Sequence, residues 1–171
     1  RDLRMSRGLG DVYKRQVQCF RDVTPRLGYT YLKDLGFEKV TDHEVINGQV
    51  FDDAREPTAL GGITNGVSTL ELTAAYAAIA NSGTYTKPVF YTKILDQNGD
   101  VVLENKPKTT EVFRESTAYL LTSALESVVN DEGGTGNGLK LDNMPVAGKT
   151  GTTSATRDVW FAGFTPYYTC A

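Results

Sequence analysis

The most regular hydrophobic pattern in the chain lies in residues 68–80, where apolar residues recur at helical spacing. Ser68 and Glu71 have the spacing of a capping box, in which each side chain accepts a hydrogen bond from the backbone of the other residue. Asn81-Ser82-Gly83 is a typical helix end. The stripe expected to be buried comprises Leu72, Tyr76 and Ile79. Five alanines flank this stripe and allow close packing on several sides, so we predict a buried helix.

Two further helices are predicted from the same kind of pattern. The first begins at Thr24-Pro25, a capping hydroxyl followed by a proline at the first helical position, and ends at Gly36. The second runs from about Arg114 to Asn130. Their expected apolar stripes are Leu27, Tyr31 and Leu35 in the first helix, and Ala118, Leu121, Leu125, Val128 and Val129 in the second.

Extended runs are predicted in two hairpins. Residues 91–95 and 100–103 are joined by Asp96-Gln97-Asn98-Gly99, and Asn-Gly between apolar runs favours a surface hairpin. Residues 146–153 and 157–166 form the second pair, a glycine- and threonine-rich strand followed by an aromatic and β-branched one. Helices together with antiparallel strands indicate an α+β fold, an antiparallel sheet covered by helices.

Two segments lack any such period. Residues 37–60 are polar and irregular, with a turn at Asn47-Gly48, and predict a long surface loop for which lining a cleft is one possible purpose. Residues 131–138 contain four glycines but lack the Gly-Lys-Ser/Thr that would complete a phosphate-binding loop. We interpret this second segment as a mobile connection into the strand that follows it.

Composition excludes several classes of partner. The 171 residues are enough for one domain with a core, and 40% hydrophobic with 23% charged residues is typical of a globular protein. A net charge of −3, from 18 basic and 21 acidic residues, gives no support to binding of nucleic acid or of an anionic membrane. No apolar run has the length needed to cross a bilayer.

The candidate metal ligands are few and scattered. Cys19 and Cys170 lie near opposite ends of the chain, so we predict buried, inert thiols rather than a disulfide framework or a metal site. His43 stands in a polar stretch without a second histidine or a cysteine nearby, which predicts a surface residue. We expect neither a metal nor a cofactor.

The two ends of the chain differ from the rest. Residues 1–16 are rich in arginine and lysine and lack an apolar period, and Gly8 and Gly10 are expected to break any helix there. Residues 11–16 resemble the in-frame translation of a sequencing-adaptor end, so we predict that residues 1–16 are not native. Residues 17–171 are then expected to be part of a larger domain, because the last residues stop inside a predicted strand.

The stretch with the clearest chemistry is Lys149-Thr150-Gly151-Thr152. In a strand, Lys149 and Gly151 point to one face while Thr150 and Thr152 point to the other. The glycine lets a ligand approach the backbone closely, and β-branched threonines present their hydroxyls on a stiff frame. An amine, hydroxyls and backbone N–H groups together suit a carboxylate and a carbonyl oxygen.

Lys-Thr-Gly-Thr followed by Asp-x-Trp-Phe-x-Gly-Phe-Thr-Pro at 158–166 resembles the transpeptidase domain of penicillin-binding proteins. The likeness is closest to the bifunctional type that polymerises and cross-links peptidoglycan, and it covers residues 17–171. It implies that Lys149 orients the proton network of the nucleophile, and that Thr150 and Thr152 bind the carboxylate of a D-alanyl-D-alanine peptide or a β-lactam. It also implies that the Thr152 N–H is one half of the oxyanion hole, next to Gly151, which has no side chain.

Asp158 and Trp160 belong to the same run, and we give both a structural role: ion pairing for the carboxylate and core packing for the indole.

The nucleophile that this resemblance requires is missing. None of the seven serines is followed by a lysine three residues later or by an asparagine two residues later. Ser-x-x-Lys and Ser-x-Asn, the other two motifs of that superfamily, are therefore absent, and we expect the chain alone to be inactive.

The resemblance leaves two alternatives. One is a serine β-lactamase, which shares the strand but hydrolyses the drug; the other is a non-catalytic penicillin-sensing or interaction domain. For the parent protein it implies the outer face of the bacterial cell membrane, reached through an N-terminal anchor outside this chain.

Overall fold

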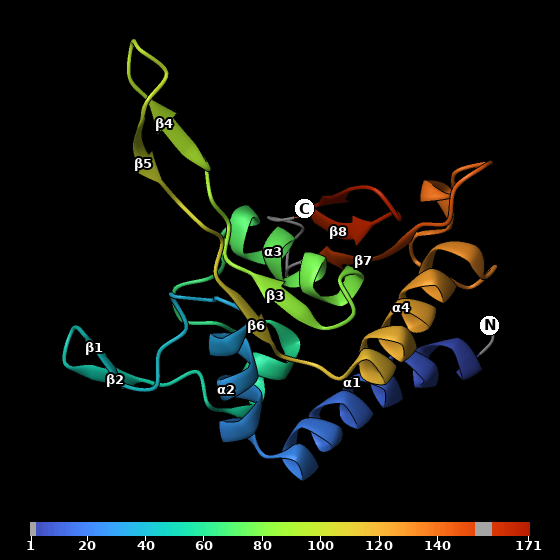
Figure 1. The fold of residues 1–171 in the computed structure, drawn as a ribbon. Helices are drawn as coiled ribbons and strands as arrows, with labels where there is room; N and C mark the ends of the chain where they lie inside the picture. The colour runs from blue at the N-terminus through green and yellow to red at the C-terminus, as the bar shows by residue number, and fades with distance from the viewer. Residues whose placement is uncertain (1–2, 153–158) are drawn as a thin grey trace. The chain divides into compact units, whose positions relative to one another are not determined.

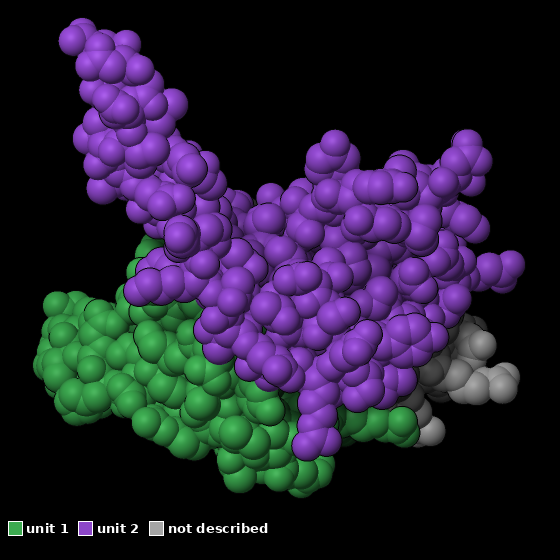
Figure 2. All heavy atoms as spheres, viewed as in Figure 1, with its two compact units in different colours: residues 1–67 green, residues 68–171 purple. Residues whose placement is uncertain are grey.

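The computed structural model describes residues 3–152 and 159–171, with backbone alone for residues 3–12. The chain divides into two compact units, residues 1–67 and residues 68–171 (Figure 2). Each unit has its own helices, its own short strands and its own buried residues. The fold is α+β, as predicted, and every strand pair in the described residues is antiparallel.

Unit 1 is built around helices near the start of the chain (Figure 1). Its elements in the described residues are α1 (Leu3–Val23), α2 (Pro25–Asp34), β1 (Glu44–Ile46), β2 (Gln49–Phe51) and the 3-10 helix η1 (Glu56–Leu60). The expectation that Gly8 and Gly10 prevent a helix is wrong. A glycine costs only about 1 kcal/mol relative to alanine, and the later half of α1 is held by tertiary contacts such as the bond from Gln16 Nε2 to the Ala59 carbonyl, 2.6 Å.

Helix α2 begins as predicted, with the Thr24 hydroxyl accepting a hydrogen bond from the Leu27 N–H and with Pro25 at its first position. Gly36 follows the helix in the left-handed conformation expected there. The predicted stripe is wrong, since Leu27 is 45% exposed and Tyr29 is the buried residue. The reason is the approach of α1: Phe20 packs where Gly28 has no side chain, which turns the Gly28–Tyr29 side inward.

Residues 37–60 are not a surface loop throughout. Asn47-Gly48 does form a turn, between β1 and β2, but Phe37 and Val40 are buried and Asp53 is fully buried. The Asp53 carboxylate accepts hydrogen bonds from the Thr41 N–H at 2.9 Å, from the Thr64 N–H at 2.8 Å and from the Thr64 hydroxyl at 2.6 Å. The irregular segment is therefore closed around a buried anion, which a hydrophobic pattern does not reveal.

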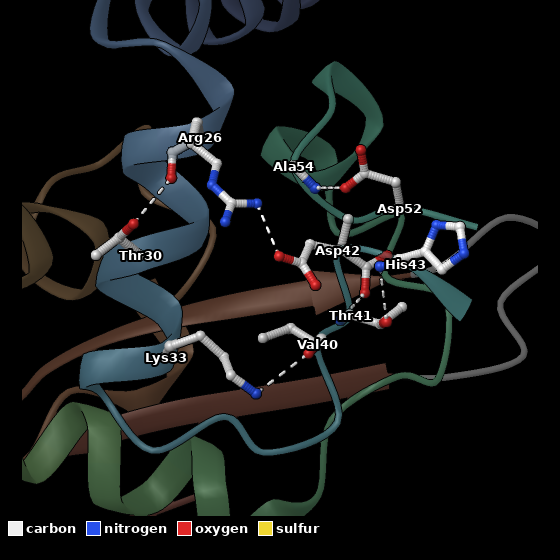
Figure 3. Close-up of polar contacts among 10 residues, drawn as sticks. Arg26, Thr30, Lys33, Val40, Thr41, Asp42, His43, Asp52 and Ala54 are labelled. Carbon is white, nitrogen blue, oxygen red and sulfur yellow. Dashed lines mark hydrogen bonds and ion pairs between the residues drawn. The ribbon is translucent and has the colours of Figure 1, made fainter. Parts of the chain in front are cut away.

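Polar contacts link α2 to the segment after it (Figure 3). Arg26 forms an ion pair with Asp42 at 2.9 Å, and Lys33 Nζ donates to the Val40 carbonyl at 3.3 Å. His43 is exposed, as predicted.

Unit 2 contains the remaining elements (Figure 1). In the described residues these are α3 (Thr69–Ala80), β3 (Thr84–Thr86), β4 (Lys93–Leu95), β5 (Val101–Glu104), β6 (Thr109–Glu111), α4 (Glu115–Asn130), η2 (Asn137–Leu139), β7 (Ala147–Thr152), β8 (Val159–Phe164) and β9 (Thr169–Cys170). The strand order of the largest sheet is β7-β8-β9, and α4 contacts β7 while α3 contacts β8 and β9. The predicted hairpin at residues 91–103 is confirmed as the exposed β4–β5 pair.

The predicted boundaries of α3 and α4 are confirmed, including the complete capping box at Ser68 and Glu71. The buried side of α3 differs from the prediction: it is formed by Ala74, Ala75 and Ala78, whereas Leu72, Tyr76 and Ile79 are half-buried. In α4, Ala118 and Val129 are buried but Leu121 is 37% exposed. In α3 the small side chains allow close packing against the sheet, so its larger side chains lie at the margins.

Two remaining expectations concern the cysteines and membrane spans. Cys19 and Cys170 are both free and exposed, so the prediction of buried thiols is wrong. Within the described residues, no helix combines the length and the apolar character required to traverse a bilayer.

The Asp53 carboxylate makes unit 1 sensitive to acid. Burial raises the pKa of Asp53, but the hydrogen bonds from Thr64 and Thr41 outweigh it and the net pKa is lowered. Its contribution is therefore complete above the unfolded pKa of about 3.9 and is lost as the pH falls through the lower, folded value. We expect Asp53→Asn to destabilise unit 1 by about 1.5–3 kcal/mol at pH 7 and to weaken this acid dependence. Hydrogen exchange of residues 41–64, measured at pH 7 and pH 3, checks both.

The matched control is Asp42→Asn, because Asp42 is an exposed carboxylate paired with Arg26. Surface pairs contribute about 0–1 kcal/mol, so this variant should exchange almost as the unaltered chain does. Equal exchange in the two variants would contradict the role given to Asp53.

Candidate functional site

The Lys-Thr-Gly-Thr stretch forms the end of strand β7, as predicted. β7 pairs with β8 along its whole length, and this register places Lys149 opposite Ala162, Thr150 opposite Phe161 and Gly151 opposite Trp160. Among the described residues β7 has no strand neighbour on its other side. One edge of β7 is thus free of sheet pairing and retains backbone groups that can bind an extended ligand.

Burial changes abruptly along this strand. Ala147 and Gly148 are buried, Thr150 is half-buried, and Lys149, Gly151 and Thr152 are exposed. The strand therefore has a packed base and an uncovered tip. The chemical groups that the sequence analysis singled out all lie at the tip.

Two paired glycines fix the base of the hairpin. Gly148 lies directly opposite Gly163, and the ring of Phe161 covers both. A β-carbon added at Gly148 would lie 2.4 Å from Phe161 Cζ, and one added at Gly163 would lie 2.6 Å from the same atom. These two glycines are required by packing within the chain.

Gly151 is a different case. A β-carbon added there would meet only Trp160 Cβ, at 3.9 Å, an ordinary van der Waals distance. Packing within the described chain therefore does not require a glycine at this position. Because Gly151 has no side chain, nothing projects from the strand at this position, which favours close approach of a ligand to the backbone.

The amine of Lys149 lies along its own strand. Nζ donates to the Thr150 carbonyl at 2.7 Å, and no carboxylate in the described part of the chain forms an ion pair with it. As far as the described residues go, this exposed ammonium is available to an anionic ligand.

The Thr150 hydroxyl has a neighbour that the sequence analysis missed. Thr135, in the glycine-rich segment 131–138, has its hydroxyl oxygen 2.8 Å from that of Thr150. The glycine-rich pattern of this segment predicts a mobile connection, but the segment contributes a polar contact to the site. The only sequence signal was one hydroxyl residue between glycines, which does not indicate a contact fifteen residues away.

The remaining predicted residues fall into two groups. The sequence predicts that Trp160 packs in the core. In the structure it lies on β8 and is only half-buried. Thr153, Arg157 and Asp158 lie outside the described residues. Across the described part of the chain, no three His, Cys, Asp or Glu side chains gather as metal ligands would.

Known proteins resemble this chain in sequence. The family model "Penicillin binding protein transpeptidase domain" matches residues 13–169. The chain is 41% identical over 121 residues to penicillin-binding protein 1A of Clostridium acetobutylicum, which covers 70% of this chain and 15% of that protein. It is 37% identical over 146 residues to penicillin-binding protein 1F of Bacillus subtilis, covering 82% of this chain and 20% of the relative.

Solved structures show the same fold. The D,D-transpeptidase domain of a peptidoglycan glycosyltransferase from Eggerthella lenta superposes with a TM-score of 0.66 at 21% identity, covering 90% of this chain and 43% of that one. The matched part of this chain spans 15% of the length of the Clostridium acetobutylicum relative and 20% of the length of the Bacillus subtilis relative.

The two kinds of glycine in the hairpin predict opposite results. Gly148→Ala should destabilise the chain by about 1–3 kcal/mol, because the new methyl group overlaps the Phe161 ring. Gly151→Ala, the matched control, should leave stability unchanged or raise it by up to about 1 kcal/mol, since its space is open. Thermal unfolding followed by circular dichroism checks this, and equal losses in both variants would contradict it.

Proposed function

Because this chain belongs to the penicillin-binding protein transpeptidase family, we propose that it forms the carboxylate-binding side of a serine D-Ala-D-Ala transpeptidase active site. The parent protein would cross-link peptidoglycan stem peptides through an acyl-serine intermediate. Its partners would be the D-Ala-D-Ala end of a stem peptide and, as inhibitors, β-lactam antibiotics. It would act at the outer face of the bacterial cell membrane.

The observation that carries this proposal is the uncovered tip of β7. Lys149 supplies a cation without an acidic partner in the described chain, and Thr150 and Thr152 supply hydroxyls. Gly151 leaves open space beside them. A peptide that ends in a carboxylate suits this set, because the hydroxyls can bind its anion, the nearby cation attracts it, and its backbone can lie along the free edge.

Each residue then has a defined role in acyl transfer. The Thr150 and Thr152 hydroxyls bind the terminal carboxylate, which places the preceding carbonyl carbon near the serine. The Thr152 N–H stabilises the negative charge that develops on the carbonyl oxygen when serine attacks. Lys149 holds a positive charge beside the proton network that activates the serine.

The serine itself comes from outside this chain. None of the seven serines here lies in Ser-x-x-Lys or in Ser-x-Asn. The chain is thus proposed to bind and orient the substrate, and a second part of the full-length protein to supply the nucleophile and the base.

Labelling by a fluorescent penicillin tests this division. We expect the full-length protein to form a covalent adduct that survives denaturing electrophoresis, because an acyl-serine ester is stable to it. The 171-residue chain alone should form none. An unlabelled full-length protein would overturn the proposal, and an adduct on the isolated chain would show that the nucleophile lies within it.

Substitutions at Thr152 test the oxyanion role within the full-length protein. Thr152→Pro removes the backbone N–H, so the acylation rate should fall about 100- to 1000-fold. Thr152→Ala keeps the N–H and loses only the hydroxyl, so the rate should fall less, about 10- to 30-fold, near the lower limit for one hydrogen bond to a charged group. Stopped-flow acylation kinetics measure both. Equal losses, in variants whose circular dichroism matches the unaltered protein, would exclude the N–H from catalysis.

A further inference from the structure

The glycine-rich segment 131–138 lies against the tip of β7, where the side chain of Thr135 is hydrogen-bonded to that of Thr150. The hydroxyl oxygens of Thr135 and Thr150 are 2.8 Å apart, and either atom can be the donor. Thr150 is one of the two residues proposed above to bind the substrate carboxylate. Whatever controls the direction of its hydroxyl proton therefore controls that binding.

The position of Thr135 is set by close contacts with the end of α4. The Gly136 N–H donates to the Val128 carbonyl at 3.0 Å, and the Gly134 N–H donates to the Asp131 carbonyl at 2.9 Å. A β-carbon added at Gly134 would lie 2.2 Å from the Val128 carbonyl oxygen. Glycine is therefore required for this approach, and both neighbours of Thr135 are held by hydrogen bonds.

The Asn137 side chain adds a further tie, since its Nδ2 donates to the Asp131 carbonyl at 3.0 Å. The segment is thus closed on itself and on α4 on both sides of Thr135. The backbone that carries Thr135 is therefore held in place where the Thr135 hydroxyl meets Thr150.

Hydrogen-bond chemistry gives this contact a direction when a ligand binds. A threonine hydroxyl has one proton and two lone pairs, whereas a carboxylate only accepts. If Thr150 donates its proton to a carboxylate, its lone pair is free to accept the proton of Thr135. A hydroxyl that accepts one hydrogen bond also donates a stronger one, because the two bonds polarise each other.

We propose that Thr135 is a positioning residue that orients the Thr150 hydroxyl toward the substrate carboxylate. This inference rests on the proposed function and deepens it, since it assigns a specificity role to a residue outside the Lys-Thr-Gly-Thr stretch. Thr135 acts through Thr150 and does not itself contact the substrate. Its effect is therefore confined to ligands that carry the carboxylate.

The test uses the full-length protein and two probes, a fluorescent penicillin with a free carboxylate and its methyl ester. Thr135→Val keeps the shape of the side chain and removes the hydroxyl. It should lower the acylation rate for the free acid about tenfold and leave the rate for the ester unchanged, so the acid-to-ester ratio falls about tenfold. Thr135→Ser should restore the ratio.

Two further variants separate positioning from stability. Thr110→Val, at an exposed position in β6, should leave both rates unchanged. In a protein that already carries Thr150→Val, adding Thr135→Val should have no further effect, because the residue through which it acts is gone.

The outcomes are distinct. Equal losses for acid and ester, or a full second loss on top of Thr150→Val, would overturn the positioning role while the proposed function stands. Failure of the unaltered full-length protein to react with the free acid would overturn both.

Discussion

The site depends on one aromatic contact, the ring of Phe161 lying over the facing glycines Gly148 and Gly163. Two glycines opposite each other weaken a strand pair, because they contribute no side-chain packing and lose much backbone entropy on ordering. The ring supplies the missing packing in the observed register. A slip by one residue would turn Lys149 and Thr150 to the opposite faces of the sheet, so the contact also decides where the reactive groups point.

The same hairpin shows how stability and function are separated along one strand. The base of β7 is buried, and its glycine has no room for a side chain. The tip is exposed, and its glycine has room that nothing in the described chain fills. A strand that is firmly held at one end can present an uncovered edge at the other, because the antiparallel pairing with β8 continues through Thr152.

Unit 1 depends on a different kind of interaction. Its irregular segment is held by the buried carboxylate of Asp53, which accepts three hydrogen bonds from Thr41 and Thr64. A buried charge is costly unless it is fully hydrogen-bonded, and here the bonds are sufficient to keep the pKa of Asp53 below its usual value. The segment is thus ordered by polar contacts, although Phe37 and Val40 also contribute apolar burial.

Local signals in the sequence were enough to place α2, α3, α4 and the β4–β5 and β7–β8 hairpins, but not α1 or the β1–β2 pair. The capping box at Ser68, the proline after Thr24 and the Asn-Gly turns act over three or four residues, so a linear reading can find them. The Lys-Thr-Gly-Thr strand and its family were recognisable for the same reason. Only the tertiary structure decided which side of each helix is buried, that Asp53 closes an irregular segment, and that Thr135 meets Thr150. These features join residues far apart in the chain, and their geometry is set by packing that no local pattern encodes.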